Sequence, residues 1–401
     1  IKAKRTIENS DYEKIKQLFL YFGFYPKADF IKHIDNNDSR PGMHMWFRIQ
    51  VDIPRCPVPA FGSSSQGEYM LLCTWSRPSE EEILDVTKQY ANKAVIVFYF
   101  ARFSELRRRD MAKLTRRWRR TLLVIDESLM LFLTRERGTR LDSLFKCAIP
   151  FSWSNPYTPF AAGEVPQEMF YGREEALLDI WNREGSCFIY GGRQLGKSAL
   201  LRHAQRKFHD PSKGNIVIKI DLGAEGIDGE TRKIQDLWLV LAKSFKEDDI
   251  IPQSMPLNAS PEVMFSHMKK WLDDKAGRRL LLLLDEADNF LDQDSTAKEC
   301  FSITQFLRGK MLQTNRRFKV VFAGLHNVQR FQKIPNQPLA HFGTPISIGP
   351  LEPKDAVNLI LKPLEALGYR FKSQNLITRI LSYTNYQPSL LQLFGDELVR
   401  N

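Results

Sequence analysis

The sequence predicts an α/β protein with two sheet-containing parts and a C-terminal helical lid. Apolar runs of strand length alternate with helix-length segments in two stretches, a proline-rich segment separates these stretches, and only helical spacing remains after about residue 351. We therefore expect an α/β, Rossmann-like N-terminal domain over 1–150, a linker over 151–168, a second α/β domain with a parallel sheet over 169–350, and a lid over 351–401.

In the first part, the predicted elements are helices over 11–22, 79–91, 102–120 and 129–145, and strands over 45–53, 69–74, 94–100 and 121–125. Ser79, followed by acidic residues, marks the start of one of these helices. The linker carries four prolines between 150 and 168, together with aromatic residues that we expect to pack against a domain.

In the second part, strands are predicted over 186–190, 215–220, 280–285 and 318–323, with helices between them. The lid is predicted to hold helices over 354–367, 373–384 and 388–400. The chain opens on Ile1 rather than Met and ends inside a predicted helix, which fits a fragment or a truncated lid.

Composition excludes several classes of protein. No apolar run approaches the roughly 20 residues that a membrane-spanning helix needs. The five cysteines are scattered without CxxC spacing, so we expect no disulfide framework or zinc site and a cytoplasmic location. The formal net charge is +11, of which residues 1–150 contribute +8 (26 Lys and Arg against 18 Asp and Glu). This excess points to a polyanionic partner such as DNA or RNA, although many basic proteins bind none.

The strongest motif is a glycine-rich loop between a predicted strand and a predicted helix. Its eight residues match GxxxxGK[ST] in full: Gly191, Gly192, Arg193, Gln194, Leu195, Gly196, Lys197 and Ser198. The glycines let backbone N–H groups approach phosphate oxygens, and the helix that continues through Ala199 offers its positive end to the same anion. We expect Lys197 to reach the β- and γ-phosphates of ATP and Ser198 to bind Mg²⁺.

An acidic pair follows the leucine-rich strand 280–284, 87 residues after Ser198. We expect Asp285 to hold Mg²⁺ and Glu286 to polarise the attacking water. Residues 285–288 also spell the DEAD tetrapeptide of helicases, but the other helicase motifs and a second motor domain are missing.

Polar residues after the strand 318–323 would lie between these two motifs. Asn327 is the first choice for a residue that senses the γ-phosphate and His326 the second, and helix capping by Asn327 is the alternative. Four arginines are candidates for a finger across a subunit interface, or else are solvated surface residues: Arg308, Arg316, Arg317 and Arg330.

One predicted helix of the first part is strongly basic. It carries Arg107, Arg108, Arg109, Arg116, Arg117, Arg119 and Arg120, with Trp118 among them. Arginine suits phosphate contact and tryptophan can stack on a base, whereas a solvated helix or one that pairs with another domain explains the charges equally well. Asp126 and Glu127 end a neighbouring strand, but no phosphate loop precedes them.

Residues 168–401 resemble the STAND group of P-loop ATPases, close to AAA+ proteins of the origin-recognition type. The resemblance rests on the hhGRE box at 170–175, the loop at 191–198, the strand at 280–286 and the helical lid with Pro388. It implies a nucleotide-dependent switch that forms a homo-oligomer or larger complex on binding ATP, with roles in bacterial antiviral defence or regulation. It further implies that Tyr171, Gly172 and Arg173 lie near the adenine and that Pro388 approaches the nucleotide, although Tyr386 replaces the usual glycine.

Two other readings stay open at this point. A DNA-remodelling or DNA-loading AAA+ protein would use ATP to do work on DNA instead of reporting a signal. A small-molecule kinase would transfer the phosphoryl group to a product, and the large lid argues against it.

Overall fold

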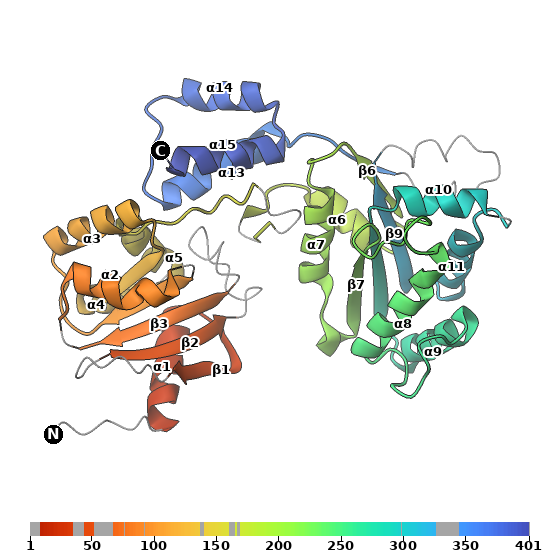
Figure 1. Cartoon of the computed structure of the whole chain (residues 1–401), viewed down its shortest axis with the longest axis horizontal. Coiled ribbons are helices and arrows are strands. Elements are labelled where there is room, and N and C mark those ends of the chain that lie inside the picture. The colour runs from red at the N-terminus through yellow and green to blue at the C-terminus, as the bar shows by residue number, and fades with distance from the viewer. Residues whose placement is uncertain are drawn as a thin grey trace.

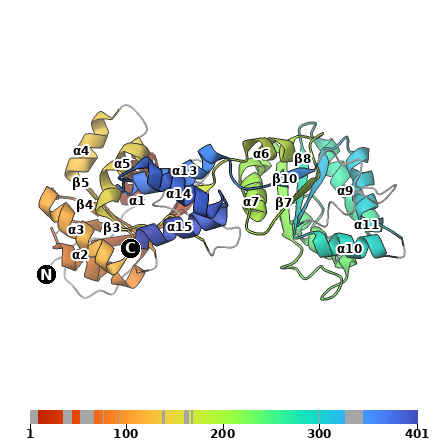
Figure 2. The same cartoon turned by 90° about the horizontal axis from the view of Figure 1, so that it is seen from above.

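The computed structural model describes residues 9–34, 44–51, 67–75, 77–91, 93–136, 140–159, 165–166, 169–297, 299–325 and 345–400. It contains two five-stranded sheets, each covered by helices, and a group of three helices at the C-terminal end (Figure 1). Two views at right angles show these three lid helices over the N-terminal sheet part, with the second sheet part beside them (Figure 2).

The N-terminal sheet has the strand order β1-β2-β3-β4-β5. Its strands are β1 (Pro26–Ile34), β2 (His44–Val51), β3 (Glu68–Thr74), β4 (Ala94–Tyr99) and β5 (Leu122–Asp126). The first three strands are antiparallel, whereas β3, β4 and β5 are parallel. The α/β prediction is confirmed, but the sheet is mixed and sequentially ordered, which differs from a Rossmann sheet, and β1 was not predicted.

Helices cover both faces of this sheet. They are α1 (Asn9–Tyr21), α2 (Glu80–Val86), the 3₁₀ helix η1 (Thr87–Tyr90), α3 (Glu105–Trp118), α4 (Glu127–Arg135) and α5 (Arg140–Ala148). The Ser79 cap of α2 is confirmed, because its hydroxyl accepts from Glu82 N at 3.2 Å and Glu82 Oε2 accepts from Ser79 N at 2.8 Å. Ile83 and Met111 share a core with one sheet face, and Phe19, Leu133 and Leu144 share a core with the other.

The second sheet is parallel throughout, with the strand order β10-β6-β9-β8-β7. Its strands are β6 (Phe188–Gly191), β7 (Asn215–Asp221), β8 (Arg279–Asp285), β9 (Phe318–Gly324) and β10 (Ile346–Ile348). Because every strand runs the same way, the residues that end β6, β8 and β9 meet at one edge, where ligands bind in such sheets.

The helices of this part are α6 (Glu174–Trp181), α7 (Lys197–Phe208), α8 (Leu237–Glu247), α9 (Pro261–Asp274), α10 (Asp288–Thr296) and α11 (Ser302–Gln313), with short 3₁₀ turns η4 (Pro211–Lys213) and η5 (Ile234–Asp236). Leucines alternate between two cores along β8. Leu280, Leu282 and Leu284 pack with α8, α9 and α11, whereas Leu281 and Leu283 pack with α6 and α7. A strand buried on both faces explains the continuous leucine run.

The lid comprises α13 (Pro353–Ala366), α14 (Gln374–Thr384) and α15 (Pro388–Arg400), as its helical spacing predicts. The 3₁₀ helix η2 (Ile149–Phe151) and the residues after it lie against α13 and α15. Tyr157 is buried, its hydroxyl donates to Ile360 O at 2.9 Å, and its ring lies against Gly395. The predicted packing of linker aromatics is thus confirmed at Tyr157, and one apolar core runs from the N-terminal sheet through Ile149 and Tyr157 into the lid.

Within the described residues, no helix combines the length and apolar character that crossing a membrane requires.

Candidate functional site

The glycine-rich loop joins β6 to α7 at the carboxyl edge of the second sheet. Gly196, with φ of 91°, turns the chain into the helix, a conformation that favours glycine. Lys197 Nζ donates to Gly191 O at 2.9 Å and to Gly192 O at 2.8 Å, so the ammonium group lies within the curve of the loop. Burial lowers the pKa of Lys197, and nearby carboxylates oppose that shift. A phosphate group of a nucleotide would offer this half-buried cation an anionic partner.

Asp285 ends β8, two strands from the loop in the sheet. Its side chain is almost fully buried, and one oxygen, Oδ1, accepts from Glu286 N at 3.1 Å. The other oxygen, Oδ2, lies 3.1 Å from Lys219 Nζ on β7, but it makes no hydrogen bond of acceptable angle within the described part of the chain. The two observations are compatible, because an ion pair depends on distance and a hydrogen bond also depends on direction.

Glu286 follows in the left-handed region, with φ of 53°. This conformation is uncommon for a residue with a side chain and places the carboxylate beside Gly223, in the loop after β7. Burial raises the pKa of Glu286, and the neighbouring carboxylates of Asp221 and Asp285 raise it further. Elevated basicity at the carboxyl edge is the property that a group positioning an attacking water requires.

Three polar residues of this edge were missed from the sequence. Asp221 ends β7 opposite Asp285 in the register, and Lys219 precedes it by two positions on the same face of the strand. Asp288 opens α10, and its Oδ2 accepts from Leu325 N at 2.6 Å while its Oδ1 is buried without a hydrogen bond from any described residue. The signal for Lys219 was a single charged residue within the apolar run 216–220.

A magnesium ion fits the donors at this edge. Magnesium prefers hard oxygen ligands and is usually bound by one or two protein oxygens together with phosphates and waters. Asp285 Oδ2 is a buried carboxylate oxygen with no hydrogen bond among the described residues, and Ser198 opens α7 immediately after Lys197. No group of three or more His, Cys, Asp or Glu in the described residues would hold a metal by itself. The arrangement therefore suits a Mg²⁺ ion that takes its remaining ligands from the phosphates of a bound nucleotide.

The lid touches the loop at one point. A Cβ atom at Gly196 would lie 4.0 Å from Cγ of Pro388, and Ser389 Oγ donates to Gln194 Oε1 at 3.5 Å. The N-terminal end of α15 is thus next to the phosphate loop despite Tyr386 in place of the usual glycine. Arg193 is exposed, Leu195 is half-buried, and Ala199 is buried in α7.

The box at 170–175 also contacts the lid. Gly172 and Arg173 both have positive φ, and the Arg173 guanidinium donates to Gly349 O. Burial lowers the pKa of Arg173, and the carboxylates of Asp355 and Glu352 oppose that shift. Lys362 Nζ lies 5.7 Å from the centre of the Tyr171 ring. The adenine contact proposed for Tyr171, Gly172 and Arg173 stays a prediction, whereas their contacts with α13 and with the segment before it are part of the structure.

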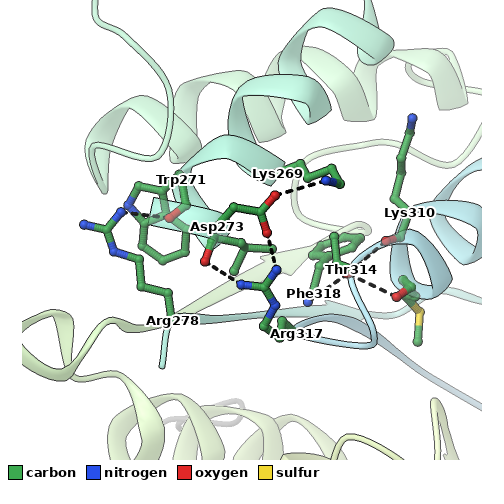
Figure 3. Close-up of polar contacts among 10 residues, drawn as sticks. Lys269, Trp271, Asp273, Arg278, Lys310, Thr314, Arg317 and Phe318 are labelled. Atoms are coloured by element: carbon green, nitrogen blue, oxygen red, sulfur yellow. Dashed lines mark hydrogen bonds and ion pairs between the residues drawn. The ribbon is translucent and has the colours of Figure 1, made fainter. Parts of the chain in front are cut away.

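Asn327, His326 and Arg330 lie outside the described residues. Two other arginine candidates have structural partners at the opposite edge of the sheet. Arg317 precedes β9 and pairs with Asp273, which also binds Lys269 (Figure 3). Arg316 lies 3.2 Å from Glu184. These two are thus neither free surface residues nor close to the phosphate loop.

The basic helix α3 divides into structural and exposed arginines. Arg107 donates to Glu80, Tyr99 and Pro78, and Arg108 pairs with the buried Asp126. Arg116 donates to Pro150 O at 2.9 Å. For these three arginines the alternative of pairing within the protein applies, and nucleic-acid contact by the seven stays a prediction. Arg117 and Arg119 are exposed, as is Trp118 at 61%, and Arg109 pairs with Glu105 on the helix surface, whereas Arg120 is partly buried.

Residues 181–331 match the family model described as AAA domain. This match contains the loop, β7, β8 and β9 but not the lid or the N-terminal part. The region thus has the P-loop NTPase fold that the strand order and the loop indicate, and it is similar to the AAA domain family over these residues. No curated protein matches the chain.

Solved structures also show similarity. The ORC1 protein of Aeropyrum pernix in complex with DNA is 15% identical with a TM-score of 0.35, and the alignment covers 59% of this chain and 63% of that one. AMPPCP-bound DnaA from Aquifex aeolicus is 17% identical with a TM-score of 0.34, covering 57% and 60%. Cdc6p from Pyrobaculum aerophilum is 17% identical with a TM-score of 0.36, covering 56% and 60%. The chain thus spans under two thirds of each of these proteins, and at such TM-scores the likeness adds nothing to the fold assignment.

Proposed function

We propose that the chain is a Mg²⁺-dependent ATPase of the AAA type. One observation carries the proposal: the loop at 191–198 and the pair Asp285 and Glu286 lie at one edge of a parallel sheet, and the half-buried Lys197 is hydrogen-bonded to carbonyls of the loop. Lys197 and the loop amides bind the phosphates, Asp285 and Ser198 hold Mg²⁺, and Glu286 orients the attacking water. Mg²⁺ itself neutralises charge that develops on the phosphates.

Two substitutions test this assignment. Lys197→Ala removes the cation of the loop and should abolish nucleotide binding. Glu286→Gln keeps the shape of the side chain but not its basicity, so ATP should bind with near wild-type affinity while turnover falls by a factor of about 100 or more. Unchanged phosphate release in either variant would refute the site.

For the work that ATP performs, we first propose DNA loading or remodelling. The supporting observation is the exposed end of α3, where Arg117 and Arg119 flank Trp118. Cations there would meet phosphates, and base stacking on an aromatic ring contributes about 1–3 kcal/mol per base. DNA should stimulate turnover with a steep salt dependence. Trp118→Ala should weaken DNA binding, whereas Leu106→Ala, which removes another exposed apolar side chain of α3, should not.

The second candidate function is a STAND-type switch, in bacterial defence or regulation, whose ATP-bound form assembles into an oligomer. The continuous core from the N-terminal sheet into the lid favours it, because a lid that follows the nucleotide would move the N-terminal part with it. Sizing the chain with ADP and with a non-hydrolysable ATP analogue, each with and without DNA, separates the two functions. Assembly that needs ATP and ignores DNA supports the switch, whereas assembly that needs DNA supports loading.

A further inference from the structure

We infer that Lys219 is a resident cation that competes with Mg²⁺ for Asp285. This inference rests on the proposed nucleotide site and adds a positioning residue to it. It follows that the site binds Mg²⁺ only when nucleotide phosphates supply further ligands, and that Asp285 does not bind the ion before the nucleotide is present.

The position of Lys219 follows from the register of two strands. Asp221 is opposite Asp285 in the β7–β8 pairing, and Lys219 lies two residues earlier on the same strand face as Val217. That face packs against α7, the helix that follows the phosphate loop. A four-carbon side chain on this face can therefore extend toward the end of β8 without leaving the interior.

Lys219 and Asp285 form a buried ion pair. The side chains of Lys219 and Asp285 are 7% and 2% exposed, and Nζ lies 3.1 Å from Oδ2. Charges are seldom buried unless they are paired, and losing one partner leaves the other uncompensated. Lys219 thus forms the ion pair with Asp285, whereas the ammonium group of Lys197 is hydrogen-bonded to two loop carbonyls and acts on Asp285 from farther away.

The same oxygen is the one available to a metal ion. Oδ1 of Asp285 already accepts from Glu286 N, whereas Oδ2 makes no hydrogen bond with any described residue and lies 3.1 Å from Lys219 Nζ. A divalent ion at Oδ2 would meet the repulsion of a buried ammonium group that water screens little. Phosphate oxygens reverse this balance, since they add negative charge on the open side of the ion.

The test measures metal affinity instead of turnover. Mn²⁺ serves as a paramagnetic probe in place of Mg²⁺, and its dissociation constant is measured by EPR on the full chain saturated with ADP. Lys219→Met should tighten Mn²⁺ binding by at least about tenfold, since it removes one unit charge beside the ligand. Lys219→Arg keeps the charge and should stay near the wild-type value.

A matched control exists in the same sheet. Lys319 on β9 is also buried, and its Nζ donates to Asp179 O and Asn182 O at the other edge, so Lys319→Met makes the same chemical change away from Asp285. It should leave Mn²⁺ affinity unchanged. If Lys219→Met fails to fold, Lys219→Gln retains a polar side chain and should tighten Mn²⁺ binding in the same direction.

The outcomes separate the two proposals. Mn²⁺ affinity that is unchanged or weaker in the folded Lys219 variants overturns the competition while leaving the nucleotide site intact. ADP that does not bind the wild type, or binds equally to Lys197→Ala, overturns the proposed function itself.

Discussion

The contact between the linker and the lid makes a prediction about Gly395 in α15. Glycine in the middle of a helix is about 1 kcal/mol less favourable than alanine, so Gly→Ala normally stabilises a helix. At Gly395 a Cβ atom would lie 2.7 Å from Cδ1 of Tyr157 and closer still to two other atoms of its ring. A contact this short forces a buried ring to move by several tenths of an ångström or more, and overpacking of this kind costs about 1–3 kcal/mol.

Gly395→Ala should therefore destabilise the chain by about 1–2 kcal/mol. Gly309, in α11, provides the matched control, because a Cβ atom there would meet nothing within 4 Å. Gly309→Ala should stabilise by about 1 kcal/mol. At roughly 2–4 °C per kcal/mol for units of this size, calorimetry should show the relevant transition move down by about 4 °C in the first variant and up by about 3 °C in the second.

The double substitution identifies the cause. In a Tyr157→Ala background the ring is gone, so Gly395→Ala should regain the stabilising sign seen at Gly309, a non-additivity expected of residues in contact. A stabilising effect of Gly395→Ala in the otherwise wild-type chain would refute the docking of the linker on α15.

Three further outcomes follow from the second sheet. Burial lowers the pKa of Lys319 to about 8, against 10.5 for an unburied lysine. Between these pH values the unfolded chain binds more protons than the folded chain, so the free energy of unfolding should rise with pH. Measured by urea unfolding, the free energy of unfolding of the wild type should rise by about 2–3 kcal/mol relative to that of Lys319→Met from pH 8 to 10.5. Arg317→Ala should leave ATP turnover unchanged in a phosphate-release assay, since Arg317 pairs with Asp273 away from the loop, and a large loss of rate would restore it as a finger candidate. Gly191→Ala should reduce ADP binding in a fluorescence titration, because its Cβ would collide with Ile348 O and displace the loop; full affinity would show that the loop tolerates the shift.

Local pattern was enough to predict the strands β6, β7, β8 and β9 and the lid helices, but not the short strand β10. The leucine run of β8 reads as a strand buried on both faces, and the loop reads as strand, turn and helix, because each signal lies within about ten residues. The first sheet was harder. The strand β1 carries four charged or polar residues among nine, and its pairing with β2 depends on contacts that no short window contains.

The residues missed at the site share a cause. The role of Lys219 depends on its ion pair with Asp285, which is 66 residues later in the chain (285 minus 219) and is brought close by the β7–β8 register. The arginines of α3 illustrate the opposite error. Arg107 and Arg108 looked available for phosphate because their partners, Glu80 and Asp126, come from other elements. Sequence patterns report which side chains a segment offers, and tertiary packing decides which of them remain available.

The docking of the linker on the lid also has a topological consequence. The P-loop domain is joined to the body formed by the N-terminal sheet and the lid at two places in the chain, after Tyr157 and before α13, instead of one. Two covalent connections restrict rotation more than a single connection does. Any movement of the P-loop domain relative to the N-terminal part would therefore be confined to a narrower range of paths.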